Sequence, residues 1–312
     1  MPKKLPAKVK EVWESKLKQS PSKNKHISYS QLVNYTTCPK KWHWQYVKKL
    51  IPYTPSIHTA FGTAMHETIQ TWLEVLYYDK VKTAEEMDLH SLLYENMMKT
   101  YRVEKAKNGH QHFSNADELQ LFYLDGIHIL DYIKKKRRVY FSTKGTYLAG
   151  VETLLYQELR PGVKFKGFID LVFYNEILDQ WTVVDIKTST SGWNKYAKAD
   201  DKKKAQVLLY KKFFSEQFDI PIEKITVEYF IVKRKIPVEA DFASMQKRVQ
   251  EFRPSEGPRK MKQAVQMMEK FVKETITDDG NFIEKDFLPT PSIDSCKFCE
   301  LKKMRICPDA VF

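Results

Sequence analysis

The chain has 312 residues and a formal net charge of +13 at pH 7, from 52 Lys and Arg against 39 Asp and Glu. Hydrophobic residues make up 42% of it, which excludes a wholly disordered chain because there is enough apolar surface for a core. We see no apolar run long enough to span a membrane and no secretory signal. The positive charge points to a polyanionic partner, most simply nucleic acid.

The first half of the chain predicts helices. After the lysine-rich residues 1–26, read as a loose arm or a short helix, Ser28 or Ser30 can cap a helix that begins near Gln31. Apolar residues at helical spacing predict further helices. These follow just after Pro39 and then cover 61–80, 84–108 and 115–140.

The second half predicts a mixed α/β core. From Gly145 the apolar period changes to two, which is typical of strands. The expected strands are 147–159, 163–174, 180–188 and 226–235, and the expected helices are about 200–217 and 258–275. Strands interleaved with helices in this order indicate a sheet covered by helices.

Four cysteines are candidates for a metal site. One lies near the start and three lie close together in the tail: Cys38, Cys296, Cys299 and Cys307. The C-x2-C spacing suits ligands because two thiolates so placed can turn toward one ion. The metal would be a [4Fe–4S] cluster or Zn²⁺, and unligated thiols packed as small hydrophobes are the alternative. If Cys38 joins the tail, the metal links the two ends of the chain.

Two aspartates in neighbouring predicted strands are candidates for a catalytic site. If Tyr174 pairs with Trp181, then Asp170 falls directly opposite Asp185. Facing carboxylates repel unless a cation lies between them, and their oxygens suit Mg²⁺ or Mn²⁺. Lys187 lies on the same face and could orient a water or stabilise charge on a phosphate.

These motifs resemble those of a known family. G-F-I-D and the following V-V-D-I-K are similar to the PD-(D/E)xK nuclease superfamily, and within it to the RecB-like branch, which also resembles CRISPR-associated and helicase–nuclease members with iron–sulfur clusters. Three further segments resemble the family's metal-binding histidine helix, its Q-x-x-x-Y motif and its first cysteine segment: F-G-T-A-M-H-E (61–67), A-Q-V-L-L-Y (205–210) and S-Y-S-Q-L-V-N-Y-T-T-C-P (28–39).

The resemblance implies a restriction-endonuclease-like fold, with a mixed central sheet flanked by helices, an inserted helical subdomain and a cysteine cluster that joins the chain ends. It implies metal ligation by His66, Asp170, Asp185 and the backbone carbonyl of Ile186, with Mg²⁺ or Mn²⁺ as the ion. The implied catalytic residues are Asp170, Asp185, Lys187, Gln206 and Tyr210. The implied cluster ligands are Cys38, Cys296, Cys299 and Cys307, for [4Fe–4S] with Zn²⁺ as the alternative.

The expected function is a metal-dependent deoxyribonuclease, an exonuclease on single-stranded DNA or DNA ends, in recombination, repair or phage DNA processing. A non-catalytic DNA-binding module, or a subunit of a helicase–nuclease complex, is the alternative. A helicase or recombination protein is a possible partner, no membrane contact is expected, and the expected location is the cytoplasm, or the host cytoplasm for a viral protein. The expected parts are a basic arm (1–26), a nuclease core (27–80 and 145–290), a helical insertion (81–144) and a cysteine segment joined to Cys38 (291–312).

Positive clusters and tryptophans are the candidate contacts with DNA. Clusters at 134–138, 202–204 and 233–235 are expected to hold the phosphate backbone. Tryptophan rings can stack on bases, although packing in the core is the alternative for each of the candidates Trp42, Trp44 and Trp193.

Overall fold

The computed structural model describes residues 5–17, 25–236 and 246–311. Residues 1–4 and 18–24 of the expected N-terminal arm therefore lie outside the described residues. The chain forms two compact units. The first comprises the described parts of Met1–Lys18, Thr54–Leu154 and Phe168–Glu256, and the second those of Gln19–Tyr53, Leu155–Gly167 and Gly257–Phe312. The expected division into arm, core, insertion and cysteine segment stays a prediction.

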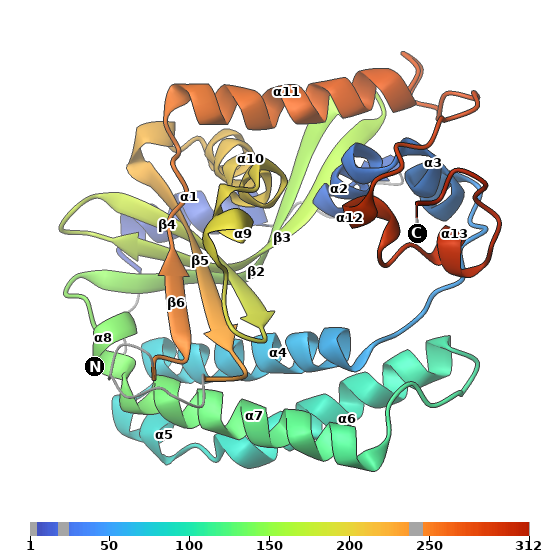
Figure 1. Ribbon diagram of the computed structural model, residues 1–312. Coiled ribbons are helices and arrows are strands. Elements are labelled where there is room, and N and C mark those ends of the chain that lie inside the picture. The colour runs from blue at the N-terminus through green and yellow to red at the C-terminus, as the bar shows by residue number, and fades with distance from the viewer. Residues whose placement is uncertain (1–4, 18–24, 237–245, 312) are drawn as a thin grey trace. The chain divides into compact units, whose positions relative to one another are not determined.

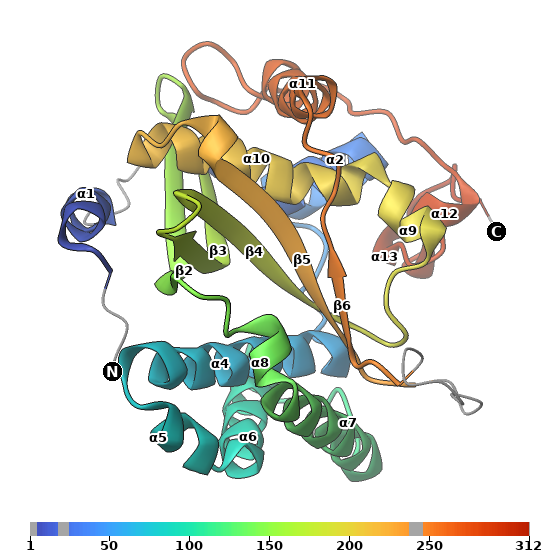
Figure 2. The same ribbon diagram turned by 90° about the vertical axis from the view of Figure 1, so that its left-hand side faces the viewer.

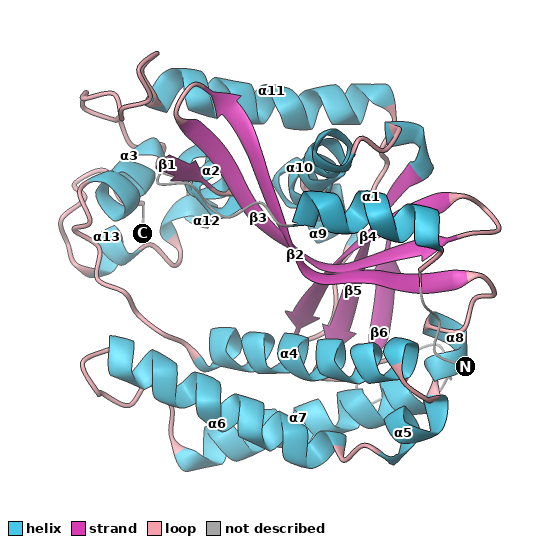
Figure 3. Cartoon of the chain, turned by 180° about the vertical axis from the view of Figure 1, so that it is seen from behind, coloured by secondary structure: helices cyan, strands magenta, loops and turns pink. Residues whose placement is uncertain are grey.

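The described residues form a mixed sheet of six strands (Figure 3). In chain order the strands are β1 (Lys25–Ile27), β2 (Thr146–Arg160), β3 (Val163–Asn175), β4 (Gln180–Ser189), β5 (Ile225–Lys233) and β6 (Val249–Phe252). The order in the sheet is β1-β3-β4-β5-β6, and β2 pairs with β3. Strands β3 and β4 are antiparallel, β4 and β5 are parallel, and β5 and β6 are antiparallel. A mixed sheet flanked by helices confirms the expected restriction-endonuclease-like fold.

Helices of the first unit cover both faces of its strands (Figures 1 and 2). Helix α10 lies along one face of β4 and β5, and α4 lies along the other with α6 and α7 beyond it. Their bounds are α1 (Ala7–Leu17), α4 (Ile57–Tyr78), α5 (Val81–Glu86), α6 (Leu89–Lys107), α7 (Ala116–Lys135), α8 (Arg137–Tyr140), α9 (Lys195–Ala199) and α10 (Asp201–Phe218), with a 3₁₀ turn at Ile222–Lys224.

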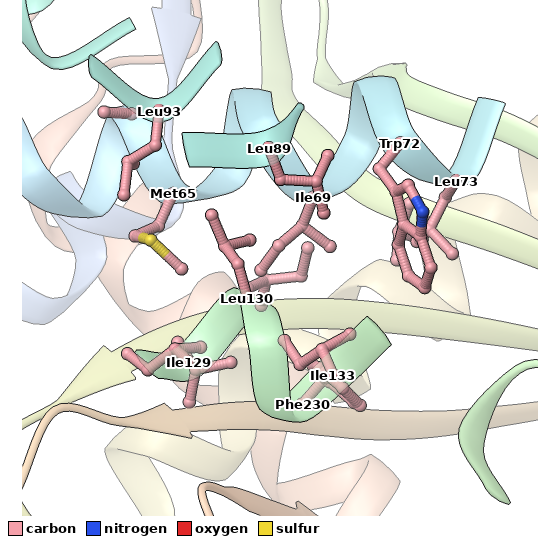
Figure 4. Packing of buried hydrophobic residues seen from close by; sticks show 14 of the residues in the cluster. Met65, Ile69, Trp72, Leu73, Leu89, Leu93, Ile129, Leu130, Ile133 and Phe230 are labelled. Carbon is pink, nitrogen blue, oxygen red and sulfur yellow. The ribbon is translucent and has the colours of Figure 1, made fainter. Parts of the chain in front are cut away.

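The core of the first unit forms around α4 because its apolar side chains recur at helical spacing. Figure 4 shows Met65 and Ile69 of α4 packed with side chains of α6 and α7 and with Phe230 of β5. Each such large side chain, once buried, stabilises the fold by roughly 1.5–3 kcal/mol. This packing fixes α4, and with it the histidine at position 66, against the sheet.

The second unit has its own aromatic core. Trp42 is fully buried and packs edge-on against Phe271 and Phe287. The Ser28 side chain accepts a hydrogen bond from the Gln31 N–H and caps α2, as the sequence predicts. The helices are α2 (Tyr29–Thr37), α3 (Pro39–Trp42) followed by a π-helical turn (His43–Val47), α11 (Pro258–Thr275), α12 (Ile293–Cys296) and α13 (Glu300–Lys303).

Two predicted helices of the insertion are each divided in the structure. The segment 84–108 is interrupted at Asp88, whose side chain accepts hydrogen bonds from the His90 and Ser91 N–H groups and so starts a new helix, α6. The segment 115–140 is interrupted at Lys136, between α7 and α8. Among the described residues, no helix combines the length and apolarity that crossing a bilayer requires.

Candidate active site

The pairing of β3 with β4 brings the two predicted aspartates together. Tyr174 pairs with Trp181, as expected, and the ladder ends at Leu171 and Val184. Asp170 and Asp185 are the next residues beyond that last pair, and both are buried. Two carboxylates therefore lie where β3 and β4 stop pairing. Beyond this point the backbone groups that face the neighbouring strand need other hydrogen-bond partners.

Asp170 satisfies one of those backbone groups. Its Oδ2 accepts a hydrogen bond of 2.6 Å from the Ile186 N–H. The same oxygen lies 3.6 Å from Nδ1 of His66, which α4 presents to the sheet. Burial lowers the pKa of His66, but the contact and charge of Asp170 and the charge of Asp185 outweigh it, so the pKa is raised above its usual value.

Asp185 is held from two sides. Its Oδ1 accepts a hydrogen bond of 2.7 Å from Nε2 of Gln206. Its Oδ2 lies 2.8 Å from the Lys187 ammonium, as an ion pair rather than a hydrogen bond of regular geometry. Burial raises the pKa of Asp185; the Lys187 charge acts against this rise, and the Asp170 charge adds to it. The raised pKa of Asp185 therefore has burial as its main cause.

Lys187 stays protonated in this setting. Burial alone would lower the pKa of its ammonium, but the charges of Asp185 and Asp170 raise it above its usual value. A half-buried ammonium fixed beside two carboxylates is a positive group that can face a phosphate without being neutralised at neutral pH.

The Q-x-x-x-Y residues face the carboxylates. Gln206 and Tyr210 lie one turn apart on α10, and the Gln206 amide donates to the Tyr210 hydroxyl at 3.3 Å. Tyr210 is buried, and this burial raises the pKa of its hydroxyl. Tyr210 contacts the amide that holds Asp185.

Two residues of this constellation were not singled out as site residues by the sequence. Nε2 of Gln70 donates to Glu152 at 2.7 Å and to the backbone carbonyl of Asp170 at 3.2 Å. Glu152 lies within β2 at a φ of +46°, a conformation that a non-glycine residue rarely adopts. A signal was present for Gln70, because it follows His66 by four residues and so shares its helix face.

Two of the predicted phosphate contacts are engaged inside the protein. The Arg234 guanidinium and the Lys235 ammonium both bind the buried carboxylate of Asp125, at 3.1 and 2.9 Å. Arg234 is itself only 7% exposed, so the expectation that it contacts DNA is wrong. Arg137, in the cluster at 134–138, binds Glu85 at 2.6 Å.

The three candidate tryptophans differ in how far they are exposed. Trp42 is fully buried in the second unit, so base stacking is excluded for it. Trp44 is half-buried, with the Lys40 ammonium 5.7 Å from its ring centroid. Trp193 is half-buried and packs on Tyr229 with ring centroids 4.7 Å apart.

The four cysteines all lie in the second unit. Cys38 follows α2, Cys296 ends α12, and the Cys299 N–H donates to the Cys296 carbonyl at 3.2 Å. Burial raises the pKa of the Cys307 thiol, and the nearby Cys38 adds to that rise. The C-x2-C segment thus forms a turn with two buried thiols.

The described residues include side chains of the types that bind metals, but these side chains do not surround a common position. In the part of the chain that the structure describes, no group of three or more His, Cys, Asp or Glu side chains is arranged to hold a metal ion. The donor set near β4, two carboxylates and an imidazole, has the chemistry that Mg²⁺ or Mn²⁺ requires. At the buried Asp185 Oδ2 the positive group that the structure places is the Lys187 ammonium, 2.8 Å away.

Comparison with protein families decides the affiliation. The family model of the PD-(D/E)XK nuclease superfamily matches residues 26–308. The chain belongs to the PD-(D/E)XK nuclease superfamily. The matched range includes Asp170, Asp185 and Lys187, the residues whose contacts are described above.

A search of solved structures finds one that resembles this nuclease-superfamily chain in fold. A protein from Eubacterium rectale described as a candidate exonuclease is 11% identical, with a TM-score of 0.52 and coverage of 99% of this chain and 96% of that chain. A protein called SSO0001 is 15% identical, with a TM-score of 0.39 and coverage of 97% and 95%. No curated protein sequence matches the chain.

Proposed function

We propose that this protein is a metal-dependent deoxyribonuclease of the RecB-like branch. The observation that carries the proposal is the meeting of two buried carboxylates, a half-buried ammonium and an imidazole where β3 and β4 cease to pair. A cluster of charged side chains taken out of water destabilises a fold, and such clusters are concentrated at functional sites. In a member of a nuclease superfamily, the function that fits this cluster is phosphodiester hydrolysis.

His66, Asp170, Asp185 and the Ile186 carbonyl would hold one or two Mg²⁺ or Mn²⁺ ions. A divalent ion bound there would lower the pKa of a water and neutralise charge on the scissile phosphate. Lys187 is placed to position that water or to stabilise the phosphate as its charge grows, because its ammonium is fixed beside Asp185. Gln206 orients Asp185, and Tyr210 supports Gln206.

The proposed substrate is single-stranded DNA or DNA ends, cleaved as an exonuclease, in recombination, repair or phage DNA processing. Support comes from the resemblance of the motifs and from the described activity of the Eubacterium rectale structure. The second candidate is a DNA-binding module without catalysis, or a subunit of a helicase–nuclease complex. The completeness of the Asp, Asp-x-Lys, His and Gln/Tyr set favours the enzyme.

The test is degradation of end-labelled single-stranded and duplex DNA with Mg²⁺ or Mn²⁺, for the wild type and for Lys187→Ala. Loss of one preorganised charge should lower the cleavage rate about 10²–10³-fold while DNA stays bound. Lys212→Ala is the matched control and should keep its rate, because this half-buried lysine of α10 pairs with Glu216 and not with the carboxylates of the site. If the wild type binds DNA but cleaves none with either ion, the binding-module candidate replaces the enzyme.

The cysteines Cys38, Cys296, Cys299 and Cys307 are proposed to bind a [4Fe–4S] cluster, with Zn²⁺ as the alternative. The support is the buried C-x2-C turn and the nearness of Cys38 to Cys307. Protein purified without oxygen should contain iron and sulfide, or zinc, and Cys299→Ala should lose it. A folded wild-type protein that contains none of these metals would contradict the proposal.

A further inference from the structure

Aromatic rings and lysines of the first unit come together on α9, the loop before it, β6 and the start of α10. Tyr196 is 72% exposed, and Trp193 and Phe252 are half-buried. We call this the aromatic–lysine surface, and it consists of Trp193, Lys195, Tyr196, Lys198, Lys203 and Phe252.

Each ring of this surface has an ammonium close to it. Nζ of Lys203 lies 5.3 Å from the Trp193 ring centroid, and Nζ of Lys198 lies 5.7 Å from that of Phe252. The Lys195 ammonium lies 5.1 Å from the Tyr196 ring. A ligand on this surface therefore meets a flat ring beside a positive charge at each of three places. This arrangement suits nucleic acid, whose bases can stack on the rings and whose phosphates can contact the ammonium groups.

The loop that carries Trp193 is held in place. The Gln250 side chain of β6 clamps the Trp193 backbone, accepting from its N–H at 2.7 Å and donating to its carbonyl at 3.2 Å. Gly192 has a φ of +90°, which favours glycine at this turn. Asn194 then caps α9 by accepting from the Ala197 N–H. A surface fixed in this way loses little conformational entropy when a ligand binds.

One buried residue, Tyr229, links the aromatic–lysine surface to the candidate active site. The Trp193 ring packs on Tyr229, and Tyr229 is the register partner of Asp185 across β4 and β5. The Tyr229 hydroxyl donates to the Lys203 carbonyl at 2.5 Å. Lys203 lies three residues before Gln206 on α10, the residue that holds Asp185. The surface thus begins one strand away from the buried carboxylates.

We propose that the aromatic–lysine surface binds the unpaired strand of the DNA substrate by stacking its bases on Tyr196 and Trp193, an inference that rests on the proposed function. Bases in a duplex are stacked on one another, so the rings can be used only by an unpaired strand. The lysines hold the phosphates between the stacked bases. The surface therefore makes the enzyme selective for single-stranded DNA.

The test measures DNA affinity by fluorescence anisotropy in the Lys187→Ala background, so that the DNA is not degraded. The probes are a labelled oligothymidylate and a labelled blunt duplex. Tyr196→Ala should lower the affinity for the oligothymidylate about five- to 150-fold, because the variant loses the stacking of one base. The affinity for the duplex should stay unchanged. Tyr196→Phe keeps the ring and should keep the affinity. Tyr94→Ala, an exposed tyrosine of α6, is the control.

The lysines provide an independent measurement. Lys203→Ala should lower the slope of log affinity against log salt for the oligothymidylate by about 0.7, the value for one phosphate contact on a single strand. Equal losses for oligothymidylate and duplex, or no loss with Tyr196→Ala and Trp193→Ala, would overturn the inference.

The outcome separates this inference from the proposed function. If the wild type cleaves no DNA while the ring-dependent preference for oligothymidylate is present, the surface stands and the enzyme does not. If the wild type cleaves and Tyr196→Ala changes neither binding nor the preference for single strands, only the surface is refuted.

Discussion

At the scale of single residues, Asp185 shows how a buried charge is made tolerable. A carboxylate taken out of water is strongly unfavourable unless hydrogen bonds and an opposite charge offset the loss. Gln206 supplies the hydrogen bond and Lys187 the charge. Asp170 works in the opposite direction, since its charge raises the pKa of Asp185. The Lys187 ammonium beside Asp185 and the His66 imidazole beside Asp170 both act against this repulsion.

Replacing Gln206 by Ala should impair the site without unfolding the protein. The change removes the donor that orients Asp185 Oδ1, and loss of such a supporting contact costs about 10–100-fold in metal affinity or activity. The measurement is the cleavage rate as a function of Mn²⁺ concentration. The half-saturating Mn²⁺ concentration should rise.

Two outcomes of that measurement are informative. Tyr210→Phe, which keeps the ring and removes the hydroxyl that Gln206 contacts at 3.3 Å, should have a smaller effect in the same direction. A Gln206→Ala enzyme with unchanged Mn²⁺ dependence would show that the amide does not orient a metal ligand.

At the scale of elements, hydrogen bonds at helix starts decide where the insertion helices begin. Asp88 accepts bonds from the Ser91 hydroxyl at 2.7 Å and from the Ser91 N–H at 3.1 Å, and these lower the pKa of its carboxyl. A group whose pKa is lowered by folding stabilises the fold above its unfolded pKa, near 4. That stabilisation is lost as the pH falls through the lowered, folded pKa.

The effect of Asp88→Asn on thermal stability should therefore depend on pH. Relative to wild type, the variant should lose more thermal stability at pH 6 than near pH 3, because only the ionised aspartate gains from these bonds. Melting temperatures measured across that range check the prediction. In a Ser91→Ala background this pH dependence should become smaller, because the hydrogen bond from the Ser91 hydroxyl is the largest cause of the lowered Asp88 pKa. A difference that is constant with pH would contradict the assignment.

The elements also show what the sequence could predict. The pairing of Tyr174 with Trp181 followed from strand period and loop length, which are local properties, and it brought Asp170 opposite Asp185. The shared face of Gln206 and Tyr210 followed from helix geometry. Strands β1 and β6 were missed, because three or four residues hold no periodic signal and pair only through distant partners.

The same reason explains the errors among charged residues. Arg234 looks like a phosphate contact in sequence, since it stands between Lys233 and Lys235. Its partner, Asp125, is 109 residues away on α7, and only the fold brings the two together. Gln70 was missed for the same reason, since its partner Glu152 is 82 residues away.

At the scale of the first unit, one buried ion pair joins the helical insertion to the sheet. Asp125 of α7 and Arg234, just after β5, have side chains that are 7% and 8% exposed, with 3.1 Å between them. Arg234 also lies over the Phe122 ring at 3.9 Å and donates to Thr190, in the loop that leaves β4. The insertion helix is therefore tied to the segment that leads from the active site to Trp193.

Asp125→Ala should destabilise the first unit by about 3–5 kcal/mol, because it leaves the Arg234 guanidinium buried without its carboxylate. Lys235→Ala is the matched control, since that side chain binds the same carboxylate but is 46% exposed, and it should cost less than about 1 kcal/mol. Urea unfolding followed by tryptophan fluorescence measures both. A double variant, Asp125→Leu with Arg234→Met, should recover much of the loss, since a matched apolar pair needs no compensation. Equal costs for Asp125→Ala and Lys235→Ala would mean that the buried pair does not hold α7 to the sheet.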